Sequence, residues 1–123
     1  MKFTRDQISR VTIRRVESGA IKVGDELVHS DVALTGEEII RDWQASRIGE
    51  LSEEDLQPLF ASDPELILLG TGRQPIFPPR ELVFALARRG VGLEAMDTAA
   101  ACRTFNILVS EGRRVAAVLI IKE

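Results

Sequence analysis

The sequence has little of what most catalytic and metal sites are built from. Its 123 residues include one cysteine, Cys102, and one histidine, His29. A single cysteine excludes an intramolecular disulfide. A Cys–His catalytic pair would need two distant segments to meet, with no third residue evident to orient them. A structural zinc site would need several carboxylates, and no spacing supplies them. We therefore expect no catalytic residues, no metal and no cofactor.

Long apolar runs are also absent. The longest, Val115–Ile121, is far shorter than the ~20 residues needed to span a bilayer. Residues 1–15 lack the apolar core of a signal peptide. The net charge is −3, from 16 basic and 19 acidic side chains, so no broad positive surface favours DNA or RNA. These absences predict a cytoplasmic protein that neither inserts into a membrane nor binds nucleic acid.

What is present is an ordinary globular composition, with 45% hydrophobic and 28% charged residues. No repeat, low-complexity segment or linker divides the chain, and its length fits one domain. We therefore expect residues 1–123 to fold as a single domain.

The first half of the chain has the pattern of short strands. Val11, Ile13 and Val16 alternate with polar residues, as in a half-buried strand. Further short apolar stretches follow the turns at Ser18–Gly19 and Gly24–Asp25. The pattern predicts an antiparallel meander.

A short helix is predicted between the two halves. Ser52, followed three residues later by Asp55, is an imperfect capping box, and Pro64 ends the helix. Upstream, Ile39–Ile40 fit either a strand or a short helix, and Trp43 is expected to anchor the core.

The second half of the chain has a different hydrophobicity pattern, in which apolar stretches alternate with amphipathic ones. Strands are predicted at Leu66–Leu69, Leu93–Met96 and Val115–Ile121. Helices are predicted between them, over residues 79–89 and from Asp97 or Thr98 to Ser110. A β-α-β-α-β order with short connections implies a parallel sheet with right-handed crossovers.

The last predicted helix has one apolar face. At 100° per residue, Ala101, Cys102 and Phe105 fall on one stripe, which predicts a buried and unreactive thiol. Arg103 and Asn106 lie well away from that stripe, so we expect them to face solvent or a neighbour.

A ligand site is most plausible at the carboxyl ends of the parallel strands, where ligands of open α/β sheets collect. One loop there offers backbone N–H groups and a guanidinium, and the other begins a helix whose N-terminus attracts anions. Together they predict a site for a small anion or carboxylate. The candidate ligand-binding residues are Gly70, Thr71, Gly72, Arg73, Asp97, Thr98, Arg103 and Asn106.

The same residues also have a purely structural interpretation. The glycines permit a tight turn, Asp97 caps a helix, and Arg103 makes a surface ion pair. The Gly70-x-Gly72 pair lacks a third glycine, because position 75 is Pro75, so it is no dinucleotide fingerprint.

Several stretches resemble a known family. They are the segments 68–72, 75–79, Gly90–Thr98 and Ala100–Leu108, the last two containing Met-Asp-Thr and Ala-Cys-Arg-Thr-Phe-Asn. They are similar to the uncharacterised domain family that includes the mitochondrial NADH dehydrogenase (complex I) assembly factor three and its small bacterial and archaeal relatives. The resemblance covers nearly the whole chain.

The resemblance implies a three-layer α/β fold, in which a central mixed sheet packs with an antiparallel N-terminal β layer. It implies no established enzyme activity or cofactor, and it implies that partners are other proteins. The leading hypothesis is therefore a non-enzymatic protein-interaction or assembly module of unknown specific function. The alternative is a small-ligand binder, or an uncharacterised enzyme, that uses the strand ends.

Overall fold

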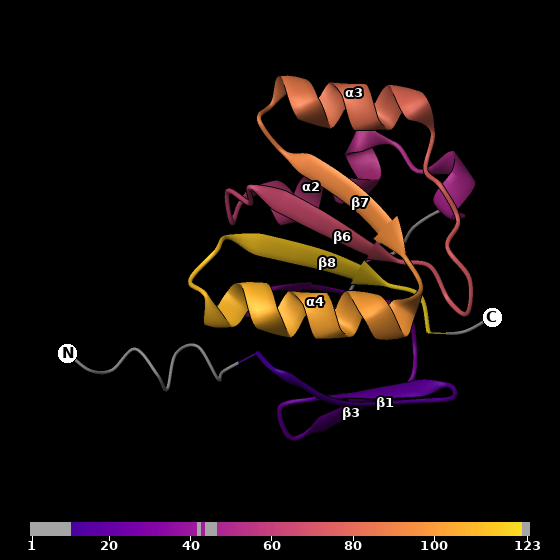
Figure 1. Ribbon diagram of the computed structural model, residues 1–123, viewed down its shortest axis with the longest axis vertical. Helices are drawn as coiled ribbons and strands as arrows, with labels where there is room; N and C mark the ends of the chain where they lie inside the picture. The colour runs from indigo at the N-terminus through magenta and orange to yellow at the C-terminus, as the bar shows by residue number, and fades with distance from the viewer. Residues whose placement is uncertain (1–10, 42, 44–46, 122–123) are drawn as a thin grey trace.

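The structure is a computed structural model that describes residues 11–41, 43 and 47–121. Within these residues the chain forms two sheets, four helical segments and their connections (Figure 1). The three-stranded sheet has the order β1-β2-β3 and the five-stranded sheet the order β5-β4-β8-β6-β7. The strands are β1 (Ile13–Glu17), β2 (Ala20–Val23), β3 (Glu26–Val28), β4 (Val32–Thr35), β5 (Ile39–Ile40), β6 (Leu66–Gly70), β7 (Gly92–Met96) and β8 (Val115–Leu119). The helical segments are η1 (Ile48–Glu50), α2 (Glu53–Phe60), α3 (Arg80–Arg88) and α4 (Thr98–Ser110).

The predicted topology is confirmed. Strands β1, β2 and β3 pair antiparallel as a meander. Strand β6 pairs in parallel with β7 on one side and with β8 on the other, while β4 joins β8 antiparallel. The five-stranded sheet is therefore mixed, with a parallel β-α-β-α-β unit at its centre and one edge.

The central sheet is covered on both faces because its strands are apolar on both sides. Along β6, Leu68 packs with α4 and the three-stranded sheet, whereas Ile67 and Leu69 pack with α2 and α3. Strand β8 alternates in the same way, with Ala117 on the first face and Val118 on the second. Figure 1 shows α4 and the β1–β3 sheet on one side of the central sheet and α3 on the other. This is the expected three-layer α/β fold.

The structure also tests the predictions made for the segment between the two halves of the chain. Ile39–Ile40 is a strand, because it pairs with β4. Ser52 and Asp55 form the predicted capping box, with Asp55 accepting from the Ser52 N–H at 3.0 Å. Trp43 is buried, and its indole N–H donates to the Asp55 carbonyl at 2.7 Å, which anchors this segment to the first turn of α2.

The last strand is shorter than predicted. It ends at Leu119, and the Ile121 N–H is bonded to the Asp31 side chain at 2.7 Å instead of a ladder partner. The chain therefore leaves the sheet where β8 meets the start of α4.

Candidate functional site

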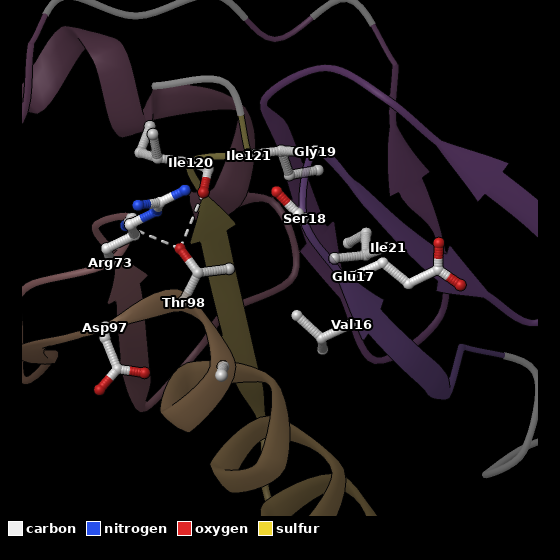
Figure 2. A pocket seen from close by; sticks show the side chains of 12 residues that line it. Val16, Glu17, Ser18, Gly19, Ile21, Arg73, Asp97, Thr98, Ile120 and Ile121 are labelled. Atoms are coloured by element: carbon white, nitrogen blue, oxygen red, sulfur yellow. Dashed lines mark hydrogen bonds between the residues drawn. The ribbon is translucent and has the colours of Figure 1, made fainter.

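Thr98 ties together three segments at the carboxyl ends of β6 and β8. Its hydroxyl donates to the Ile120 carbonyl at 2.8 Å and accepts from the Gly72 N–H at 2.8 Å, as Figure 2 shows. Its own N–H donates to the Gly72 carbonyl at 2.8 Å. A buried hydroxyl with both donor and acceptor satisfied in this way stabilises the junction. Thr98 therefore works as a connector of the fold.

Thr71 closes the loop after β6. Its hydroxyl accepts from the Ile76 N–H at 3.0 Å and donates to the Gln74 carbonyl at 2.5 Å, with the Met96 carbonyl at 3.2 Å. The Thr71 N–H itself donates to the Met96 carbonyl at 2.9 Å. The loop was expected to offer exposed N–H groups, and that expectation is wrong for Thr71 and Gly72. Both N–H groups are bonded within the fold, so neither points to a ligand.

Glycine is required at positions 70 and 72 for two different physical reasons. At Gly70 a Cβ would lie 2.9 Å from the Leu119 Cδ2 and 3.0 Å from the Thr98 Cα, so glycine lets α4 approach β6 closely. At Gly72, φ is +99°, a left-handed conformation that glycine adopts without strain. Gly72 therefore matches the tight-turn interpretation, whereas Gly70 lies in β6 and is required by the close packing of α4 instead.

Asp97 caps α4 as predicted. Its carboxylate accepts from the Ala100 N–H at 2.8 Å. The positive end of the helix is thus already occupied by a negative group of the chain itself. Together with the bonded loop N–H groups, this leaves a small anion without the backbone donors that the sequence-based hypothesis required.

A cavity of about 630 Å³ does lie at the predicted place. Gly72, Arg73, Asp97 and Thr98, half of the eight candidate residues, line one side of it. Figure 2 shows the opposite side, formed by the tip of the β1–β2 hairpin at Val16–Gly19. Sequence reasoning found the turn at Ser18–Gly19 but missed that it faces the strand ends, because that placement depends on packing between the two sheets.

Asn106 does not line this cavity; of the two alternatives expected for it, solvent or a neighbour, it contacts a neighbour, strand β1. Its side-chain oxygen accepts from the Ile13 N–H at 2.9 Å, and its amide nitrogen donates to the Ile13 carbonyl at 2.7 Å. An amide side chain pairs with a backbone in this way as a second strand would. Asn106 therefore holds β1 against α4.

Arg103 is exposed and does not line the cavity. It makes no hydrogen bond or ion pair with the residues that the structure describes, so the surface ion pair considered for it is absent there. The eight candidate residues thus separate into four that line the cavity, two buried ones (Gly70 at the end of β6 and Thr71 just after it), Asn106, which holds β1, and Arg103, which is exposed outside the cavity.

Cys102 has the buried position that its helical stripe predicts, with 1% of its surface exposed. Burial raises the pKa of its thiol to about 12, and the nearby Arg103 charge offsets only part of that rise. The thiol therefore stays protonated and unreactive at neutral pH.

Two further possibilities, a metal site and a membrane-spanning helix, can be checked across the described part of the chain. In residues 11–41, 43 and 47–121 no three His, Cys, Asp or Glu side chains are grouped as metal ligands. Among the same residues, every helix is too short or too polar to cross a bilayer.

Exposed apolar side chains on the loop before α3 and on α3 itself are the feature that sequence reasoning missed. Phe77 is 78% exposed, Ile76 48% and Phe84 56%. Phe84 lies on the outer face of α3, opposite the buried Leu82 and Leu86. The sequence feature that could have predicted this exposure is the apolar pair Ile76–Phe77, which lies between prolines and fits no strand or helix pattern. We call Ile76, Phe77 and Phe84 the aromatic surface.

The fold and these contacts define a small three-layer α/β protein whose strand-end loops are bonded within the structure. The chain belongs to the family described as "Protein of unknown function (DUF498/DUF598)", whose model matches residues 13–120. This confirms the family resemblance of the sequence.

Relatives of this family carry varied names. The chain is 36% identical over 73 residues to a "13 kDa major membrane protein" of Francisella tularensis, covering 59% of each chain. It is 37% identical over 83 residues to the NADH dehydrogenase [ubiquinone] 1 alpha subcomplex assembly factor 3 of Danio rerio, covering 66% of this chain and 48% of that one. The chain therefore spans less than two thirds of both relatives.

Solved structures share the fold. A crystal structure of a Bordetella parapertussis protein superposes with a TM-score of 0.83 at 36% identity. The match covers 91% of this chain and 96% of that one.

Proposed function

We propose that this protein is a non-enzymatic docking module that binds another protein through its aromatic surface. The observation that carries the proposal is the exposure of Phe77 and Phe84, at 78% and 56%. Large aromatic side chains contribute much of the binding energy in protein interfaces. Two of them, one on the loop and one on the helix that follows it, are the exposed side chains from which a partner would gain most.

The loop that carries Ile76 and Phe77 is held in place before any partner binds. Thr71 bonds to both Gln74 and Ile76, and prolines at 75, 78 and 79 restrict the backbone further. Figure 1 shows this segment swinging outward from the end of β6 before it reaches α3. An anchor that is already ordered loses less conformational entropy on binding.

The names of relatives support a role in assembly. The Danio rerio relative is named an assembly factor of the NADH dehydrogenase 1 alpha subcomplex. Such a factor acts by binding other proteins, and the exposed aromatic surface offers this chain a means to do so. That name identifies no partner for this chain.

Partner capture with matched variants tests the proposal. The tagged full-length protein would be expressed at native level, cross-linked in its own cells and purified as wild type, Phe77→Ser/Phe84→Ser and Ile107→Ser. Ile107 is 56% exposed on α4, which makes it a control equal in exposure to Phe84. We expect a stoichiometric partner with wild type and Ile107→Ser, and its loss with the double variant. Equal capture by all three proteins would contradict the proposal.

A small ligand in the strand-end cavity is a second candidate function. The observation in its favour is the cavity of about 630 Å³, with Val16, Ile21 and Ile120 as apolar lining and Arg73 at its side. Because the loop N–H groups are bonded, the ligand would be mainly apolar rather than a small inorganic anion. Native mass spectrometry of protein from its own cells would detect such a ligand, and Val16→Trp, at a partly exposed lining residue, should displace it.

We also propose a cytoplasmic location. The only cysteine is a buried thiol, and the fold is stabilised without a disulfide, as is usual in reducing compartments. Since one relative is named a membrane protein, fractionation of cells expressing the native protein is the direct test. Recovery in the salt-washed membrane fraction would contradict this location.

A further inference from the structure

The geometry of α3 points to the chemistry of the partner: we propose that it presents an acidic segment with apolar anchors. The segment would place carboxylates on Arg80 and Arg88 and an apolar side chain on Phe84. This inference rests on the proposed docking function and goes beyond it by naming what the docking surface recognises.

Arg80, Phe84 and Arg88 are spaced four residues apart on α3. Side chains at i and i+4 are neighbours on a helix, so the three form one row with the aromatic ring in the middle. All three are exposed, and Leu82 and Leu86 on the opposite face hold the helix against the core. The row is therefore positioned by a buried helix face and is itself open to a partner.

The two guanidinium groups of this row differ from most others on the surface. Five other exposed arginines have carboxylate partners; Arg41, for example, lies 2.6 Å from Glu26, and Arg89 lies 2.8 Å from Glu53. The rest of that set is Arg15, Arg113 and Arg114. Arg80 and Arg88 have no hydrogen bond or ion pair among the described residues. A chain with a net charge of −3 thus leaves two cations unneutralised on either side of an exposed ring.

Unpaired arginines beside an aromatic ring favour a carboxylate-bearing partner. A guanidinium binds a carboxylate through two parallel hydrogen bonds, which adds direction as well as charge attraction. Complementary charge around an apolar anchor increases the association rate and rejects partners of the wrong sign. Glu81 is the one carboxylate within α3, so the expected complement is mainly acidic.

An acidic protein segment fits the surface better than an anionic membrane does. The row is one ring wide, and the two leucines of α3, Leu82 and Leu86, are buried in the core. A peripheral membrane helix would need a wide apolar face with many basic residues, and the net charge of −3 opposes approach to anionic lipid. Vesicle binding is nevertheless an outcome that the experiment must register.

The test uses the ¹⁵N-labelled full-length protein and three defined probes. One is a pool of short synthetic peptides with Leu or Phe anchors flanked by Glu, and the second has Lys in place of Glu. The third is a phosphatidylglycerol vesicle. We expect the acidic pool alone to shift the amide signals of residues 80–88, with binding that weakens as salt is raised. Shifts located elsewhere, equal response to the basic pool, failure of the acidic pool to bind, or binding to vesicles would overturn the inference.

Charge reversal separates this inference from the docking function itself. Arg80→Glu/Arg88→Glu should weaken binding of the acidic pool by about tenfold or more and create binding of the basic pool. Arg103→Glu is the control, because Arg103 is also exposed and unpaired within the described residues but lies on α4. In the cellular capture, loss of the partner with the aromatic variant but not with the reversal would overturn the acidic partner and leave the docking function intact. Retention by both variants would overturn both.

Discussion

Asn106 on α4 pairs with the backbone of Ile13 on β1, ninety-three residues earlier in the chain, through two hydrogen bonds. The Ile13 N–H donates to the Asn106 side-chain oxygen at 2.9 Å, and the Asn106 amide donates to the Ile13 carbonyl at 2.7 Å. The β1–β2 register is irregular between Ile13 and Arg15. The Asn106 side chain thus attaches the three-stranded sheet to α4 beside this irregularity.

Replacing this amide should loosen the three-stranded sheet. Asn106→Ala removes both partners of the Ile13 backbone, and we expect a loss of about 1–3 kcal/mol in the free energy of unfolding. Hydrogen exchange should accelerate in β1 and β2 more than in β6 or β8. Arg103→Ala, one turn earlier on the same helix, is the control and should change little. Uniform exchange acceleration across both sheets would show that Asn106 does not act as a local clamp.

The two layers on either side of the central sheet should nevertheless unfold together. Strands β4, β6 and β8 contribute residues to the apolar clusters on both faces, so neither cluster can dissolve without exposing the other. We expect a single transition in urea that coincides when followed by Trp43 fluorescence and by circular dichroism. Two separated transitions would contradict the prediction that the chain is one domain.

The hydroxyl of Thr98 should contribute measurably to stability. Thr98→Val keeps the shape of the side chain but leaves the Gly72 N–H and the Ile120 carbonyl without this partner. Each buried group left unpaired is costly, so we expect a loss of about 2–3 kcal/mol in denaturant unfolding. Thr98→Ser retains the hydroxyl and should recover most of that loss. If the serine and valine variants were equally stable, the hydrogen bonds would not be the cause.

A structural feature can be predicted from the sequence when the residues that determine it lie close together in the chain. The capping residues Ser52 and Asp97 and the buried face of Cys102 follow from patterns within one helix, and the structure confirms all three. The parallel unit was also predictable, because apolar runs separated by helices leave few arrangements.

The site was harder to predict because its contacts join distant segments. Asn106 was correctly placed off the apolar stripe of α4, but the strand it meets lies at the other end of the chain. Likewise, no local pattern shows that the Thr98 hydroxyl occupies the Gly72 N–H that a ligand would need. The exposure of Phe77 and Phe84 is a tertiary property too, because a large apolar side chain is usually expected in the core.

The buried thiol should make stability depend on alkaline pH. Burial raises the pKa of Cys102 from 9.0 to about 12, so above pH 9 the unfolded chain loses this proton before the folded chain does. The folded state then holds more protons, and its stability falls as pH rises between those two values, by up to about 1.4 kcal/mol per pH unit. Below pH 9 the contribution of the protonated thiol is fully present.

Comparison with Cys102→Ala isolates this effect. The difference in pH dependence between wild type and the variant, measured by urea unfolding from pH 7 to pH 11, should appear only above pH 9. A thiol reagent at neutral pH should label the native protein slowly and the urea-unfolded protein rapidly. Fast labelling of the native protein would mean that the thiol is accessible and that the assigned burial is wrong.

Gly70 should be intolerant of a side chain because α4 crosses β6 there. In Gly70→Ala the new methyl group would lie 2.9 Å from the Leu119 Cδ2, 3.0 Å from the Thr98 backbone and 3.1 Å from the Ala101 Cβ. Leu119 can turn aside, but the α4 backbone can move away only by disturbing the hydrogen bonds of Thr98 to Gly72 and Ile120. We expect a loss of about 1–3 kcal/mol, measured by thermal and urea unfolding. Gly49→Ala is the matched control, since nothing lies within 4 Å of its added Cβ. If the two alanine variants were equally stable, the close approach of α4 to β6 would not limit the residue at position 70.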